Sequence, residues 1–352
     1  MEKFDWSFSA RVNILMLKLV GLWPKNDNIY GFNLYTLYTT LSTFLFIYAH
    51  TFFQLMEIFY VYVDIEAVIA ILFVTSSELL ATFKISVYQK KIAVLKRLMV
   101  ELRTEVPQPK DTDQVTLVRP NLRSYTIIYY TFSVSTLITV TLWSVFPILD
   151  KSKEYQLPFS AWYPFDTKSS PVYELTYVYQ VVSIWFMAVA HVNIDTLISA
   201  LLTFIGAQCD VLSDDLKKIC TGEELVECVK RYRAIVSFAT DCNEFFAMMI
   251  LGQFLTSAIS SGLSMFRLTV VEPFSSEFYS LLFFVSSVTT QNFLYCWFGN
   301  EAEFKVRVVF FFNFLNQNHD HLEHPLGWFT SKISQQYFLK THDSGISIDI
   351  TK

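Results

Sequence analysis

Charge, glycine and proline are all scarce in this chain of 352 residues. Charged residues make up 17% of it, against about 25% in soluble domains, which is too little charge to cover a globule of this size. Nine glycines and ten prolines exclude a collagen-like chain and disfavour a glycine-rich nucleotide-binding scaffold. The net charge of −5 leaves no basic face for phosphates, so we expect no nucleic-acid partner.

Apolar and aromatic residues fill the chain instead. Hydrophobic residues account for 53% of it, and 34 Phe, 19 Tyr and 7 Trp are present. Long uncharged runs predict an all-α, polytopic membrane bundle with lipid as its solvent. Six runs reach the roughly 20 residues that a crossing helix needs: Ile29 to Phe52, Ile65 to Tyr88, Tyr125 to Leu149, Tyr173 to Ala207, Asn243 to Phe266 and Phe278 to Phe298.

These runs divide the chain into three parts. Residues 1–29 form an amphipathic N-terminal segment, in which apolar residues recur at steps of three and four up to the turn at Gly21 to Pro24. This helix is expected either on the inner membrane surface or against its own protein. Residues 30–300 form the membrane bundle with its ligand pocket, and residues 301–352 form a polar tail.

The distribution of positive charge predicts the orientation. Of the 27 Lys and Arg residues, 23 lie on the N-terminal segment, on alternate connections and on the tail, and these segments should face the cytosol. Lys84, at the inner end of the second span, is counted with the connection that follows it. An intracellular N-terminus follows, which argues against a rhodopsin-like receptor. All the cysteines fall in or beside the predicted inner segments, so no outer disulfide is expected: Cys209, Cys220, Cys228, Cys242 and Cys296.

Few charged groups fall inside the predicted spans. Glu78 lies midway along the second span, where it either lines a cavity or is hydrogen-bonded at a helix interface; the second reading is favoured. His191 and Asp195 share one face of the fourth span and are expected near the inner headgroups, as a solvated or interhelical pair.

Signatures of catalysis are missing. The chain contains no nucleophile elbow, Walker loop, dinucleotide fingerprint or zinc-protease helix, so we predict neither an enzyme nor a cofactor. One metal-like cluster, with spacing that fits no standard site, is better explained as a polar tail: His319, Asp320, His321, Glu323 and His324.

The outer half of the bundle is rich in aromatic and hydroxyl side chains. A pocket for a small apolar molecule needs aromatic walls and a few orienting hydroxyls. The same residues would also serve as ordinary interhelical packing. The predicted ligand-binding residues are Phe73, Ser77, Leu142, Phe146, Tyr173, Tyr177 and Phe283.

The loop before the fourth span carries the most specific motif. It reads Leu157-Pro158-Phe159, Trp162-Tyr163-Pro164-Phe165-Asp166 and Ser170-Pro171-Val172-Tyr173-Glu174, with Gln180 one turn into the helix. This loop strongly resembles the second extracellular loop of insect odorant receptors. The Gly21-Leu22-Trp23-Pro24 turn and Leu294-Tyr295-Cys296-Trp297-Phe298-Gly299-Asn300-Glu301 are similar to that family too.

The resemblance implies a fold and a function. It implies seven helices and a ligand-gated cation channel, in which a variable odorant-binding subunit assembles with a shared co-receptor as a heterotetramer. A small volatile odorant would bind in the outer bundle, and long helices would project inward as a cytosolic anchor. The expected location is the plasma membrane of olfactory neuron dendrites.

The sequence departs from the family after Glu301. The family continues into a seventh span that lines the pore, whereas the run from Phe304 to Leu315 is interrupted by Lys305 and Arg307 and is followed by polar residues. With no stretch of about 20 apolar residues there, we expect this pore helix to be missing and the chain alone to be non-conducting. A truncated partner or trafficking subunit and a gustatory-type chemoreceptor are the alternatives. A transporter is disfavoured because no internal repeat is visible.

Overall fold

The computed structural model describes residues 8–24, 33–104, 109, 111–149, 155–219 and 221–319. Within these ranges every regular element is helical, which confirms the all-α prediction. The elements are α1 (Phe8–Leu19), α2 (Leu34–Thr43), the π-helical turn η1 (Phe44–Ala49), α3 (His50–Tyr60), α4 (Ile65–Thr104), α5 (Thr112–Leu149), α6 (Val172–Lys217), α7 (Gly222–Val270) and α8 (Ser276–His319).

Five segments are long and apolar enough to cross a membrane: Leu34–Tyr60, Ile65–Leu102, Thr112–Leu149, Val172–Lys217 and Gly222–Val270. They contain the first five predicted spans, apart from residues 29–33 of the first, of which 29–32 lie outside the described residues. The sixth predicted span lies within α8 but is not among the five. We attribute this to the polar pair Gln291 and Asn292, which dilutes its apolar run.

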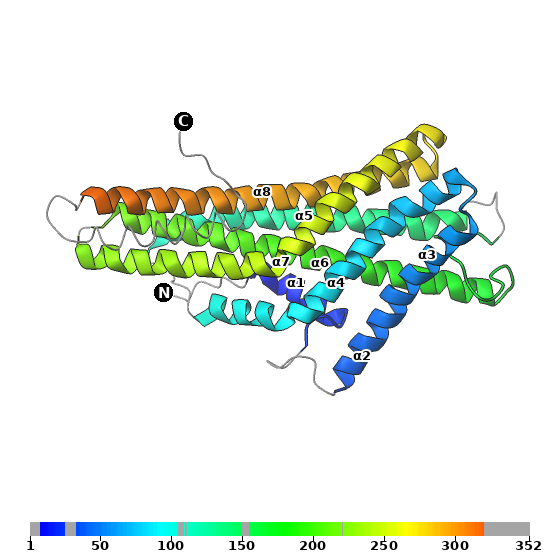
Figure 1. Cartoon of the computed structure of the whole chain (residues 1–352), viewed down its shortest axis with the longest axis horizontal. Coiled ribbons are helices and arrows are strands. Elements are labelled where there is room, and N and C mark those ends of the chain that lie inside the picture. Colours follow the sequence, from blue (N-terminus) through cyan, green and yellow to red (C-terminus); the bar gives the residue numbers. More distant parts are fainter. Residues whose placement is uncertain are drawn as a thin grey trace.

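The long helices run beside one another and form an elongated bundle (Figure 1). The helix α6 has 46 residues and α7 has 49. At 1.5 Å per residue, each is more than twice as long as a hydrocarbon core of about 30 Å. Each must therefore extend beyond the membrane, as expected for the fourth span.

The first helix packs on the bundle and also presents an apolar face outward. Asn13 is buried, its amide donates to Thr196 Oγ1 on α6 at 2.6 Å, and its oxygen accepts the Tyr125 hydroxyl of α5 at 3.0 Å. Leu15 and Leu19 are 61% and 67% exposed. These contacts establish the packing of α1 on its own protein, and the exposed leucines leave a face suited to lipid.

Glycine is required where α1 ends. Gly21 has φ +78°, and a Cβ atom there would lie 3.1 Å from the Thr39 Cα atom. The hydroxyls of Tyr35 and Tyr38 donate to the carbonyls of Lys18 and Leu19 at 3.0 and 2.8 Å. These bonds satisfy carbonyls that the helix end leaves free, so the turn is pinned to α2.

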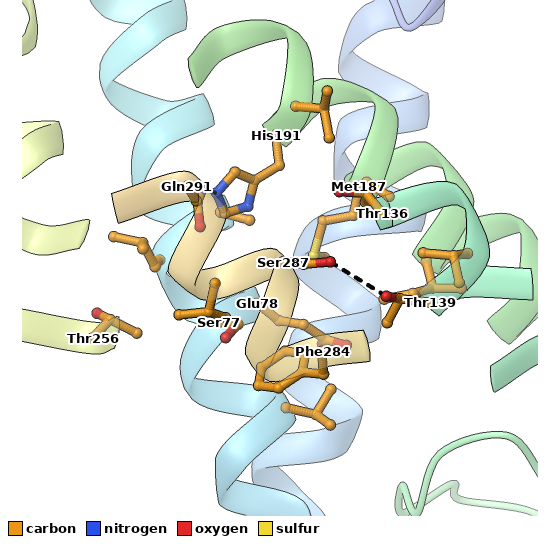
Figure 2. A pocket seen from close by; sticks show the side chains of 18 of the residues that line it. Ser77, Glu78, Thr136, Thr139, Met187, His191, Thr256, Phe284, Ser287 and Gln291 are labelled. Carbon is orange, nitrogen blue, oxygen red and sulfur yellow. Dashed lines mark hydrogen bonds between the residues drawn. The ribbon is translucent and has the colours of Figure 1, made fainter. Parts of the chain in front are cut away.

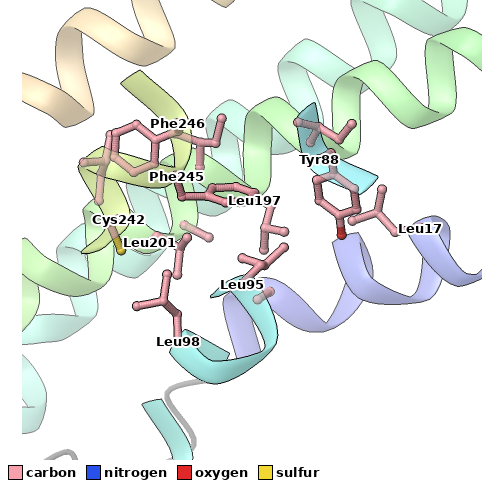
Figure 3. Close-up of a cluster of buried hydrophobic side chains, with 14 of the residues drawn as sticks. Leu17, Tyr88, Leu95, Leu98, Leu197, Leu201, Cys242, Phe245 and Phe246 are labelled. Atoms are coloured by element: carbon pink, nitrogen blue, oxygen red, sulfur yellow. The ribbon is translucent and has the colours of Figure 1, made fainter. Parts of the chain in front are cut away.

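A large apolar core lies in the half of the bundle that contains α1 (Figure 3). It joins α1, η1 and the helices α4 to α8. The members labelled in Figure 3 are Leu17, Tyr88, Leu95, Leu98, Leu197, Leu201, Cys242, Phe245 and Phe246. Leu17, Leu95 and Leu98 are completely buried. The described cysteines are free thiols, and Cys220 lies outside the described residues.

The helix α8 continues past the predicted boundary at residue 301. The run from Phe304 to Leu315 belongs to this helix, which ends at His319. Lys305 holds it to α6 because its Nζ lies 2.7 Å from Asp210 Oδ2. The same Nζ lies 2.8 Å from Glu301 Oε1, one turn earlier on α8. The rest of the predicted tail, with Asp320, His321, Glu323 and His324, lies outside the described residues.

Candidate ligand cavity

A cavity of about 120 Å³ lies between α4, α5, α6, α7 and α8 (Figure 2). Its walls are mainly apolar, with Met187 and Ile184 of α6, Trp143 and Phe132 of α5, and Phe284 of α8. On each of the five helices the lining residues recur mostly at steps of three and four, so they share one face of the helix. The cavity therefore has the concave, apolar character of a small-molecule site.

Hydroxyl groups interrupt the apolar wall where α5 meets α8. Ser287 shares a hydrogen bond of 2.9 Å with Ser135. It shares a second one, of 3.4 Å, with Thr139 (Figure 2). On the opposite side, Ser77 shares a bond of 3.2 Å with Ser260 of α7. These hydroxyls are already paired, and thus they supply weak polarity along a wall that remains largely apolar.

One end of the cavity is polar. His191, Gln253 and Gln291 line it and also contact a buried ion pair between Lys84 of α4 and Asp195 of α6. Lys84 Nζ lies 2.8 Å from Asp195 Oδ1, and both side chains have no exposed surface. The ion pair thus lies directly behind the side chains that form this end of the cavity.

Neighbouring groups surround the Asp195 carboxylate on both oxygens. The Tyr295 hydroxyl donates to Oδ1 at 2.5 Å. His191 Nε2 lies 3.0 Å from Oδ2, which also accepts the Gln291 amide. Gln253 accepts from Lys84 at 2.5 Å. The result is one connected network that links α4, α6, α7 and α8; we call it the Lys84–Asp195 network.

This network corrects one assignment made from the sequence. Lys84 was counted among the inner connecting residues, yet it is buried in the bundle and is the main partner of Asp195. Of the two readings of His191 and Asp195, the interhelical one is confirmed and the solvated one is wrong for Asp195. Burial is tolerated because each charge finds its opposite together with further hydrogen bonds.

Both readings of Glu78 apply at once. Its Oε1 accepts the Gln54 amide of α3 at 3.0 Å, as expected of a group bonded at a helix interface. The same residue is 2% exposed and lines the cavity. Glu78 therefore connects α3 with the cavity wall.

A second space of about 360 Å³ adjoins this cavity, and Val74 and Trp143 line both. We call it the outer cleft because the loop before α6, with Pro158 and Phe159, forms part of its lining. Four aromatic rings stand between the two spaces. Phe284 lies 5.4 Å from Phe73 and 5.5 Å from Trp143 between ring centroids, and Trp143 lies 5.4 Å from Phe159. These rings form the wall between the cavity and the outer cleft.

The loop motif positions one of these rings. The Gln180 side chain accepts from the Phe159 backbone N–H and donates to its carbonyl, both at 3.0 Å. The same amide donates to the Tyr163 hydroxyl at 3.2 Å. Gln180 thus replaces the backbone partners that Phe159 lacks in an irregular loop, and it holds the ring over the bundle.

The predicted ligand-binding residues fall into three groups. Ser77 lines the cavity, whereas Phe73, Leu142 and Phe146 line the outer cleft. The other three line neither space: Tyr173, Tyr177 and Phe283. Tyr177 and Tyr173 instead donate to the carbonyls of Ser144 and Gln156, each at 2.9 Å, and it is Phe284, next to Phe283, that enters the cavity wall.

Several residues of the polar end were missed: Gln253, Gln291 and Tyr295. The available signal was the presence of polar side chains inside two otherwise apolar spans, because such groups are rare in membranes and face the bundle interior. What a linear pattern cannot show is that these groups converge on Lys84.

Comparison with known proteins agrees with this architecture. Residues 64–307 match the family described as 7tm Odorant receptor. The chain is 23% identical to odorant receptor Or1 of Anopheles gambiae over 337 residues, covering 86% of this chain and 80% of that protein.

Solved structures share the fold. The insect olfactory receptor OR5 from Machilis hrabei superposes with a TM-score of 0.74 at 16% identity, covering 85% of this chain and 80% of that one. Its complex with eugenol gives a TM-score of 0.71 at 17% identity, covering 83% and 79%. Since the family match spans more than half of the sequence, the chain is a membrane protein of the odorant receptor family, a receptor and not an enzyme.

Proposed function

We propose that this chain is an odorant receptor subunit that binds a small volatile apolar molecule in the cavity between α4 and α8. The observation that carries the proposal is a mostly apolar cavity with one polar end, lined by five helices of an odorant receptor bundle. The related Machilis hrabei receptor has been solved with eugenol, which supports a small-molecule ligand here.

The predicted residues take different parts in this proposal. Ser77 contacts the ligand, and the outer cleft at Phe73, Leu142 and Phe146 is its route of entry. Tyr173 and Tyr177 act by bracing the outer connections. Phe283 supports the wall through its neighbour Phe284. The bundle of residues 30–300 would hold the site, between the segments 1–29 and 301–352.

Signalling would follow from contact between the ligand and the polar end of the cavity. His191, Gln253 and Gln291 face the cavity and also belong to the Lys84–Asp195 network, which joins four helices. A ligand that repositions these side chains would change how the helices pack beyond the membrane. We propose that this gates a cation channel formed with the co-receptor as a heterotetramer, at the dendritic plasma membrane of olfactory neurons.

The test is to express the full chain with and without an insect co-receptor and to record currents evoked by a panel of small volatile compounds. Ala188→Phe adds a ring to the cavity wall and should abolish the responses, since no space remains for ligand. Val178→Phe is the matched control, because Val178 lies on the same helix and is 60% exposed. Undiminished responses from Ala188→Phe at normal surface expression would refute the proposed site.

A further inference from the structure

Glu78 has one carboxylate oxygen that is buried and has no partner. Its Oε1 accepts the Gln54 amide at 3.0 Å, whereas Oε2 has no hydrogen-bond partner. Among the described residues that line the cavity, only Thr136 Oγ1 shares this property. A buried oxygen left unpaired has lost its water and gained nothing in return, so it favours any ligand that donates to it.

The neighbours of Glu78 determine which chemistry it offers. Gln54 Oε1 accepts the Thr75 hydroxyl at 3.0 Å, which turns the amide nitrogen toward Glu78. Oε1 is therefore the acceptor of this pair. The remaining contact is His50 Nε2, 3.5 Å away on the same oxygen. Gln54 and His50 both contact Oε1, so Oε2 remains available to accept a hydrogen bond.

Charge compensation at Glu78 is also incomplete. In the described part of the chain its carboxylate pairs with no lysine or arginine, and the one histidine beside it is His50. Lys84, six residues further along α4, is bound to Asp195 instead. A hydrogen-bond donor from the ligand would thus provide stabilisation that the protein itself does not.

The size of the cavity limits the rest of the ligand. At about 120 Å³ it is close to an engineered apolar cavity of about 150 Å³ that binds benzene. The cavity that Glu78 lines is mostly apolar, with Val140 and Phe284 in its walls, and Figure 2 shows Phe284 beside Glu78. One small ring or a short chain fits, with its polar group at one position.

We propose that Glu78 accepts a hydrogen bond from the ligand's hydroxyl, so that the cavity selects small apolar alcohols over ethers and hydrocarbons of the same shape. This inference rests on the proposed function. To that function it adds Glu78 as the residue that determines specificity, and alcohols as the chemical class of the ligand. A site built to bond a hydroxyl rejects analogues without one far more strongly than an apolar pocket distinguishes a methylene group.

The experiment compares three probes on the full chain expressed with the co-receptor: cyclopentanol, methoxycyclopentane and methylcyclopentane. Cyclopentanol should act at a concentration about 10- to 100-fold lower than the other two, as expected for a hydrogen bond to a charged group. Equal potency of the three probes, or responses to other odorants with none to cyclopentanol, would overturn the inference.

Glu78→Gln tests the residue itself. If Gln54 keeps its bond to the carbonyl oxygen, the new amide nitrogen takes the place of Oε2 and a donor replaces the acceptor. The alcohol should lose its advantage and methoxycyclopentane should gain. Glu66→Gln, exposed in the first turn of the same helix, is the matched control. A variant that keeps the full preference for alcohol would assign the selection to another group.

Failure of the proposed function has a different result. In that case no compound of the wider panel evokes a current with the co-receptor, and Ala188→Phe changes nothing. If only the present inference fails, odorants still activate the receptor and filling the cavity still abolishes their effect. The hydrocarbon response of Glu78→Gln shows in addition that the variant has folded and reached the surface.

Discussion

Asp195 and Glu78, two of the carboxylates buried in the described part of the bundle, differ in how their charge is compensated. Asp195 has Lys84 at 2.8 Å, His191 at 3.0 Å and a tyrosine hydroxyl at 2.5 Å. Glu78 has a neutral amide at 3.0 Å and a histidine at 3.5 Å, with one oxygen unpartnered. Both residues are at most 2% exposed.

The difference in charge compensation corresponds to two roles that a buried carboxylate can have. A fully paired carboxylate ties helices together, because removing any partner leaves a charge without compensation. An incompletely paired one leaves bonding capacity for a molecule from outside. We therefore expect substitutions around Asp195 to affect folding first, and substitutions at Glu78 to affect ligand selection first.

The largest effect is expected from Lys84→Met. It leaves Asp195 ionised and buried without its cation and should lower the free energy of unfolding by about 3–5 kcal/mol. Thermal unfolding of the detergent-solubilised chain measures this. Lys90→Met, at an exposed position of the same helix, is the control. Similar melting of the two variants would show that the pair adds little.

A double variant sharpens the same point. Lys84→Met combined with Asp195→Leu removes both charges, and apolar replacements for a buried pair are often neutral or stabilising. The double variant should thus be more stable than Lys84→Met alone. If the two losses of stability simply add, the ion pair is not what couples these residues.

An intermediate effect is expected from Tyr295→Phe. The change removes one hydroxyl that donates to Asp195 and leaves the ion pair in place. Hydrogen bonds to charged groups contribute about 1.5–3 kcal/mol, so the loss should be smaller than for Lys84→Met. Unfolding in the same detergent ranks the two, and the reverse order would contradict this account of the network.

The smallest change in stability is expected from Glu78→Gln. The new side chain keeps an acceptor for Gln54 and removes a poorly compensated charge, so unfolding should change by less than about 1 kcal/mol. Asp195→Asn removes the charge that balances Lys84 and should cost about 3–5 kcal/mol. Equal losses of stability from the two substitutions would show that the two carboxylates do not differ in this way.

Much of the fold was predictable because the bilayer imposes simple rules. Long uncharged runs predicted the helices, and the loop motif indicated the family that the comparisons confirm. The set of cavity-lining helices was largely anticipated, while the exact residues were less so. Phe283 was named where Phe284 enters the wall, since successive residues point about 100° apart and packing alone decides which faces inward.

The burial and pairing of charged side chains were the least predictable features. Lys84 follows a long apolar run and looks like the end of a span, yet it lies at the centre of four helices. Its partner is 111 residues away along the chain. A one-dimensional count of positive charge cannot distinguish an exposed lysine from a paired one, because the distinction is made by residues on other helices.

By itself, the sequence determined that this protein is a helical membrane bundle of the odorant receptor family, because hydrophobic run length and local motifs are properties of short segments. Only the tertiary structure decided that Lys84 meets Asp195, that aromatic rings separate the cavity from the outer cleft, and that one oxygen of Glu78 is left without a partner. Those outcomes depend on the rotation and depth at which separate helices pack, which no single segment encodes.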